Sequence, residues 1–172
     1  MTYTPTETPR IYVACLAAYN NGILHGEWID CDQDADSIQE EINAMLKQSP
    51  EPNAEEWAIH DSDCFKGLKI SESESIEKVA ELAALIGEHG AAFAAYVDHV
   101  GMEYATADGF QESYRGKYES EKDFAEELWN ETREIPDFLR SHIDWESVAN
   151  DLFVDDYFGS RRDSKTYVFN RN

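Results

Sequence analysis

The acidic residues between Asp30 and Glu41 have the spacing of the ligands in an EF-hand calcium loop. Counted from Asp30, acids occupy positions 1, 3, 5, 7 and 12, from which such a loop supplies oxygen ligands. Position 6, where the loop needs glycine for its sharp turn, is Ala35, and the preceding residues resemble a strand instead of a helix. One hypothesis is therefore a weak divalent-cation (calcium) site. The other is a solvated connection whose acids favour the N-terminus of the next helix.

The other side chains that could bind a metal or catalyse a reaction form no recognised arrangement. The run His60-Asp61-x-Asp63-Cys64 could ligate a metal, but no second cluster accompanies it, so a strand end with surface acids is the better interpretation. The three cysteines are scattered, which indicates reduced thiols instead of a disulfide framework or a zinc site. The chain has no Gly-x-Ser-x-Gly, phosphate loop or dinucleotide fingerprint. The preferred interpretation is a protein without catalytic residues, metal or cofactor.

The remaining signal is the charge itself. The chain of 172 residues carries 36 Asp and Glu against 14 Lys and Arg, a formal net charge of -22. The acids are interleaved with aromatic and aliphatic residues, so they belong to folded elements and not to a tail. This charge opposes binding to nucleic acids or anionic membranes. Rows of carboxylates can instead imitate DNA, which presents about one negative charge per ~1.7 Å of its axis. Solubility and salt adaptation, including a salt-adapted enzyme, are the alternatives.

Two absences in the sequence bear on location. No run approaches the ~18 apolar residues that a membrane span needs. Residues 1–10 lack the basic and apolar regions of a signal peptide, so we expect a cytoplasmic protein.

Hydrophobic periodicity and turn residues predict an α+β fold, an elongated chain of three small domains. Residues 1–66 are expected to form an antiparallel three-stranded sheet plus a helix, residues 67–108 a small helical domain, and residues 109–172 an α+β unit. The expected elements of the first domain are strands Ile11–Ala18, Ile23–Asp30 and Glu56–Asp61 and helix Asp36–Lys47, with an Asn-Gly hairpin turn and Gly26 as a bulge or close-packing point. Those that follow are helices Ser75–Glu88, Ala91–Val100, Ser120–Thr132, Pro136–Arg140 and Trp145–Phe153 and strands Tyr157–Phe158 and Thr166–Phe169.

Four sequence blocks follow one another between about residues 10 and 155. They are Ile11–Gly22 continuing to Gly26-Glu27-Trp28; Glu56–Asp61; Phe110–Tyr118 followed by Asp123-Phe124-Ala125; and Glu134-Ile135-Pro136-x-x-Leu139 with Ile143-Asp144-Trp145 and Asp151-Leu152. As an ordered set they resemble the ArdA family of antirestriction proteins.

This resemblance implies a DNA mimic, encoded on a plasmid, transposon or phage, that binds type I restriction-modification enzymes through their methyltransferase core and blocks access to DNA. It also implies an elongated, curved molecule of three small domains that forms a homodimer, without catalytic residues or cofactor. In the family, the segment around Glu134 to Asp144 is associated with the dimer contact.

Two sets of residues follow as candidates. The acidic surface that would imitate DNA comprises Glu27, Asp30, Asp32, Asp34, Asp36, Glu40, Glu41, Glu55, Glu72, Glu74, Glu77, Glu81, Glu112, Glu119, Glu121, Asp123, Glu126, Glu127 and Glu131. The dimer contact comprises Phe110, Tyr114, Tyr118, Glu134, Pro136, Phe138, Leu139 and Ile143, although such residues could instead form the core of their own domain.

Overall fold

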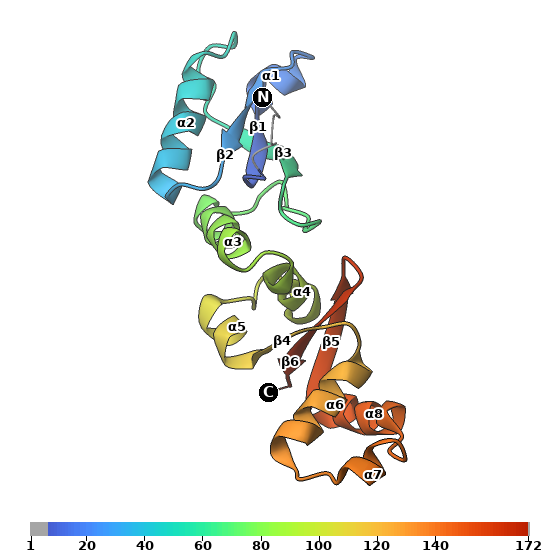
Figure 1. Cartoon of the computed structure of the whole chain (residues 1–172). Helices are drawn as coiled ribbons and strands as arrows, with labels where there is room; N and C mark the ends of the chain where they lie inside the picture. The colour runs from blue at the N-terminus through green and yellow to red at the C-terminus, as the bar shows by residue number, and fades with distance from the viewer. Residues whose placement is uncertain (1–6, 172) are drawn as a thin grey trace, which may run out of the picture. The chain divides into compact units, whose positions relative to one another are not determined.

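The protein, described here by a computed structural model over residues 7–171, is a mixed α+β chain (Figure 1). Its contacts divide it into two compact units, Met1–Gly90 and Ala91–Asn172, and each contains one three-stranded antiparallel sheet. The α+β class is therefore as the sequence predicted, whereas the division into three domains stays a prediction. None of the helices in residues 7–171 is long and apolar enough to cross a membrane.

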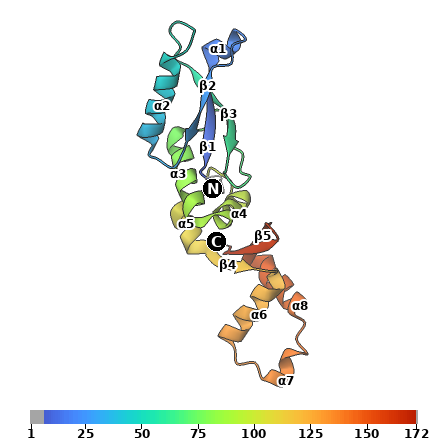
Figure 2. The same ribbon diagram turned by 45° about the horizontal axis from the view of Figure 1, so that its top comes forward.

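The first unit is built on a sheet in the order β2-β1-β3. Its elements are β1 (Arg10–Cys15), α1 (Leu16–Asn20), β2 (Gly26–Asp30), α2 (Ala35–Lys47), β3 (Trp57–Asp63) and α3 (Ile76–His89). Ile11, Val13 and Cys15 alternate along β1 and are fully buried. Helix α2 packs beside β2, as both views show (Figure 2), and buries Ile38 and Ile42. The sheet face and the helix stripe together form the core of this unit.

The connection between the first two strands differs from the expected hairpin. Strand β1 ends at Cys15, not Ala18, because Leu16–Asn20 forms the short helix α1. The Asn-Gly pair ends this helix: the N–H groups of Asn21 and Gly22 donate to carbonyls in its last turn, and Gly22 has φ +77°. Strand β2 consequently starts at Gly26 and not at Ile23.

Gly26 lies where the backbone of β2 approaches β1 closely. A Cβ at this position would lie 2.5 Å from the carbonyl oxygen of Val13 and 2.7 Å from the hydroxyl of Tyr12. Because one of these atoms is backbone, Gly26→Ala should lower the free energy of unfolding by about 1–3 kcal/mol. Gly87→Ala is the matched control, since no atom lies within 4 Å of its Cβ on α3, and it should stabilise by about 0.5–1 kcal/mol. Denaturant unfolding of both variants would measure this, and equal effects would contradict it.

The second unit is a sheet in the order β4-β6-β5 covered by helices. Its elements are α4 (Ala91–Val100), α5 (Ala107–Ser113), β4 (Tyr114–Tyr118), α6 (Glu121–Thr132), α7 (Asp137–Arg140), α8 (Trp145–Asp155), β5 (Tyr157–Arg162) and β6 (Lys165–Asn170). Helix α5 and strand β4 were not among the expected elements. Helices α6 and α8 pair through Trp129 and Trp145, whose ring centroids are 5.8 Å apart.

Aromatic side chains hold α4 and α5 to the sheet of this second unit. Tyr96 of α4 and Phe110 of α5 each contact Phe169 of the central strand β6, at centroid distances of 5.6 and 6.1 Å. Phe93 and Phe169 are fully buried. Such tilted and edge-to-face ring pairs add stability beyond the area that they bury. Phe110 is thus a central residue of this core.

Candidate acidic interaction surface

Helix α2 presents carboxylates on the side opposite its buried stripe. Asp36 and Glu40 are exposed one turn apart, whereas Ile38 and Ile42 are buried against the sheet. Residues four apart on a helix are neighbours on its surface, with Cβ atoms roughly 5–6 Å apart. Asp34 accepts a hydrogen bond from the backbone N–H of Ser37 at 2.7 Å, and this bond lowers its pKa. The helix therefore starts and continues on acidic residues.

Helix α3 carries a second row. Glu77 and Glu81 are four residues apart and Glu88 lies two turns further along, all exposed. Lys78 forms an ion pair with Glu81 at 3.6 Å, so the row is partly neutralised. Val79 and Leu82 occupy the buried side of the helix.

Helix α6 carries the most regular row, formed by Asp123, Glu127 and Glu131. All three are exposed and each is four residues from the next, so they lie along one side of the helix, about 6 Å apart along its axis. Their field reaches into the protein: burial raises the pKa of Tyr118, and the carboxylates of Glu127 and Glu131 raise it further. Like charges at this spacing repel one another, so the row is unfavourable for the isolated helix.

The structure exposes nearly all of the predicted acidic surface. Only Glu74, Glu121 and Glu126 of the set are half-buried. The ion pair between Glu119 and Lys165 lowers the pKa of Glu119. Sequence reasoning missed Glu88 on α3, and on α8 it missed the exposed pair Asp151 and Asp155. The four-residue spacing of that pair was the signal that could have found it.

Two carboxylates of the Asp30–Glu41 segment, those of Asp34 and Glu41, accept hydrogen bonds within the protein. Asp34 caps α2, and the amide of Gln33 donates to the Glu41 carboxylate and to the Asp30 carbonyl, each at 2.8 Å. The helix begins at Ala35, which is position 6 of the calcium-loop count. Residues that such a loop needs for its turn are therefore helical here. Among residues 7–171, no group of three or more His, Cys, Asp or Glu side chains is placed to hold a metal ion.

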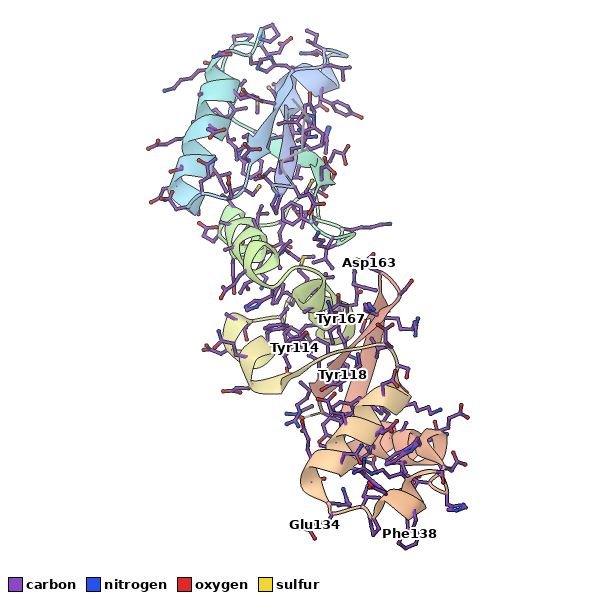
Figure 3. The ribbon with its side chains drawn as sticks, in the orientation of Figure 1. Tyr114, Tyr118, Glu134, Phe138, Asp163 and Tyr167 are labelled. Atoms are coloured by element: carbon purple, nitrogen blue, oxygen red, sulfur yellow. The ribbon has the colours of Figure 1, made fainter. Side chains whose placement is uncertain are left out.

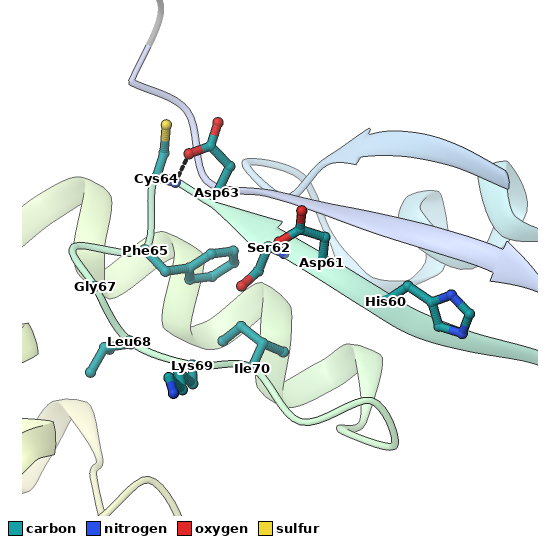
Figure 4. A pocket seen from close by; sticks show the side chains of 10 residues that line it. All are labelled: His60, Asp61, Ser62, Asp63, Cys64, Phe65, Gly67, Leu68, Lys69 and Ile70. Carbon is teal, nitrogen blue, oxygen red and sulfur yellow. Dashed lines mark hydrogen bonds between the residues drawn. The ribbon is translucent and has the colours of Figure 1, made fainter.

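The His60–Cys64 segment lines an open pocket of about 440 Å³ at the end of β3 (Figure 4). Asp63 accepts two hydrogen bonds from the Arg10 guanidinium, at 3.0 and 3.2 Å, and this pairing holds its pKa below the usual range. The ring of His60 contacts Tyr19 edge-on at 4.9 Å. Burial raises the pKa of the Cys64 thiol, which favours its unreactive protonated form. This arrangement supports the interpretation as a strand end.

The thiol of Cys31 is predicted to be inert at alkaline pH. Burial raises its pKa from its ordinary value near 9 to about 12, and the carboxylates of Asp30 and Asp32 contribute to the increase. Since only the thiolate reacts, alkylation of the native protein at pH 9 should be at least about a hundredfold slower at Cys31 than after unfolding. Mass spectrometry of protein alkylated with and without denaturant measures this. Equal rates in the two states would contradict the protected thiol.

The structure separates the predicted dimer residues into two groups (Figure 3). One group lies on and beside α7: Glu134 and Pro136 are exposed, and so are Phe138 and Leu139, with 73% and 42% of their surfaces accessible. The adjoining Ile143 is half-buried and packs against the cluster around Trp145. These residues form what we term the α7 segment, residues 134–143.

The other group belongs to the interior of the second unit. Phe110 is buried, as the alternative interpretation of these aromatics anticipated, and stacks on Tyr114 at 4.9 Å. Tyr118 contacts Phe124 edge-on at 5.1 Å. Burial is the main cause that raises the pKa of both Tyr114 and Tyr118. A contribution of this group to a dimer contact stays a prediction.

The matching family model defines the class of protein. It is described as antirestriction protein (ArdA) and covers residues 11–164 of the 172-residue chain, and so includes both sheets up to the start of β6. Among curated proteins, no sequence matches. The protein is thus an antirestriction protein, an inhibitor of restriction. The chain belongs to the ArdA family.

Proposed function

We propose that this protein inhibits type I restriction-modification enzymes by occupying the DNA-binding cleft of their methyltransferase core as a DNA mimic. The observation that supports this proposal is the set of exposed carboxylate rows on α2, α3 and α6. A cleft that binds DNA neutralises phosphates with Lys and Arg, so a protein surface with carboxylates at short, regular intervals can replace the phosphates. No catalytic residue takes part: inhibition is competition for a surface.

The proposal includes how the protein works in the cell. It acts in the cytoplasm, as the product of a mobile genetic element, on enzymes that would otherwise act on the incoming DNA. It binds as a homodimer whose contact includes the exposed α7 segment, which would double the number of carboxylates offered to one target. Phe138 and Leu139 supply the apolar surface that such a contact needs.

Competition against labelled duplex DNA tests the function. A purified type I methyltransferase core is loaded with a duplex containing its recognition sequence, and the protein is added at several salt concentrations. We expect displacement of the duplex at low salt, with the logarithm of the inhibitor affinity falling linearly as the logarithm of salt concentration rises. Bovine serum albumin, another acidic protein, is the control for net charge without the carboxylate rows. Failure to displace the duplex at low salt would refute the proposal.

A further inference from the structure

The first unit exposes large apolar side chains at the connection between β1 and β2. Among the described residues of this unit, the large apolar side chains that are exposed all lie between Tyr19 and Trp28. Leu24 has 88% of its surface accessible and Tyr19 has 52%, with Ile23 also exposed. Scattered exposed apolar residues are ordinary, whereas several of them on one short connection are characteristic of an interaction site. We call residues 19–24 the apolar tip.

The apolar tip is held by hydrogen bonds on both sides. The N–H of Ile23 donates to the Ala18 carbonyl at 2.9 Å, and the N–H of Cys15 donates to the His25 carbonyl at 2.8 Å. The imidazole of His25 bonds to the Met45 carbonyl of α2 at 2.7 Å. The tip is therefore fixed to both the sheet and the helix, so presenting Leu24 to a partner requires little ordering of the chain.

Trp28, also exposed in this unit, differs from Leu24 because its ring has contacts within the protein. The Tyr12 ring lies 5.5 Å from it, and the guanidinium of Arg10 lies 4.7 Å above it. The tip residue Tyr19 touches the edge of His60. Leu24, by contrast, keeps most of its surface in water, so its exposure remains to be explained by a partner.

The surroundings of the tip indicate the partner. Glu27 is exposed at the start of β2, and Glu56, also exposed, accepts a backbone hydrogen bond from Leu16 of α1 at 3.0 Å. Glu55 adds a third exposed acid beside Glu56. A surface that covers the tip must therefore combine an apolar recess with a basic rim. An anionic membrane or a second copy of this acidic chain would bring like charges together.

We infer that the apolar tip inserts into an apolar recess beside the basic DNA-binding cleft of the restriction-modification enzyme. The inference rests on the proposed function and adds to it a contact that DNA itself does not make. The carboxylate rows give an attraction that salt weakens, whereas burial of Leu24 and its neighbours gives a contribution that salt leaves in place. The tip thus retains part of the inhibitor affinity when ionic strength is high.

Leu24→Ser tests the inference in the duplex-displacement assay with a type I methyltransferase core. We expect roughly tenfold weaker inhibition, as for loss of one well-buried anchor, at both low and high salt. The slope against salt should stay unchanged, because no charge is removed. Val154→Ser, which removes an apolar side chain of 66% exposure from α8, is the matched control and should inhibit like the unaltered protein.

The outcomes separate the inference from the function on which it rests. Inhibition by Leu24→Ser equal to that of the unaltered protein would overturn the inference while the function stands. A change in the oligomeric state of Leu24→Ser, measured by sedimentation, would overturn it in favour of a contact between copies. Failure of the unaltered protein to displace DNA would refute the proposed function itself.

Discussion

Neutralising the α6 row with Asp123→Asn, Glu127→Gln and Glu131→Gln together should weaken inhibition of a type I enzyme by roughly tenfold to a hundredfold at low salt. The reason is collective: each carboxylate that replaces a phosphate releases counterions from the enzyme cleft, and the contributions add along the row. The triple variant should also show a shallower dependence on salt. Displacement of labelled duplex DNA at several salt concentrations measures both effects.

Single neutralisations should have small effects. Glu27→Gln or Glu127→Gln removes one exposed charge, and an exposed pair is worth roughly 0–1 kcal/mol, which is about fivefold at most. The control for the triple variant replaces each acidic residue by the other acidic type. Asp123→Glu, Glu127→Asp and Glu131→Asp together keep the charge of the row and should keep inhibition. Full activity of the neutralised row would exclude α6 from the binding surface. Abolition of activity by one neutralisation, with the fold intact, would refute the collective mechanism.

Charged substitutions on the α7 segment should give monomers. Two chains of net charge -22 repel each other, so the proposed dimer would depend on a local apolar contact. Phe138→Glu with Leu139→Glu replaces the exposed apolar side chains of α7 by two further charges in each chain. Sedimentation should then show a monomer, whereas we expect the unaltered protein to sediment as a dimer. Val154→Glu on α8 adds a charge at another exposed apolar position, outside the α7 segment, and should leave the dimer in place.

Salt should act on the two kinds of association with opposite signs. Low salt strengthens self-repulsion and loosens the dimer, while it tightens binding to a basic cleft. The monomeric variant should still inhibit, though more weakly, because it offers half of the carboxylates. If the variant with both substitutions folds normally and is still a dimer, the dimer contact lies outside α7. Tyr114→Asp is unsuited to this test, since Tyr114 stacks on the buried Phe110 and its loss would disturb folding.

The elements that the sequence predicted are those with a strong local signal. Helices α6 and α8 were predicted close to their observed starts because Ser120 and Asp144 precede them; each of these side chains caps its helix by accepting a backbone hydrogen bond in the first turn. Strand β4 was missed because its five residues contain Gly116 at φ +138° and an irregular register against β6. Its strand character depends on a partner about fifty residues later, which no local pattern reveals.

The candidate site shows the same division between local and non-local information. Exposure of the acidic rows was predictable because helical spacing places Asp123 and Glu127 on the side of α6 opposite the buried Ala125. The role of Phe110 was not, since an aromatic residue suits a core and an interface equally well, and only contacts with Phe93 and Phe169 place it inside. The apolar tip was hidden by an expected tight hairpin, in which Ile23 and Leu24 would have been strand residues.

The strand order β4-β6-β5 has a consequence for synthesis of the chain on the ribosome. Strand β6 is central and pairs with both of its neighbours, yet it is the last of the three to be translated. While residues 119–164 emerge, β4 has no strand with which to pair, and its backbone groups must be hydrated or shielded by the nascent helices. The first unit has by then received all of its strands. Because the chain is synthesised from its N-terminus, the sheet of the second unit forms last. The unpaired strands of this unit are exposed to misfolding and aggregation until β6 has been made.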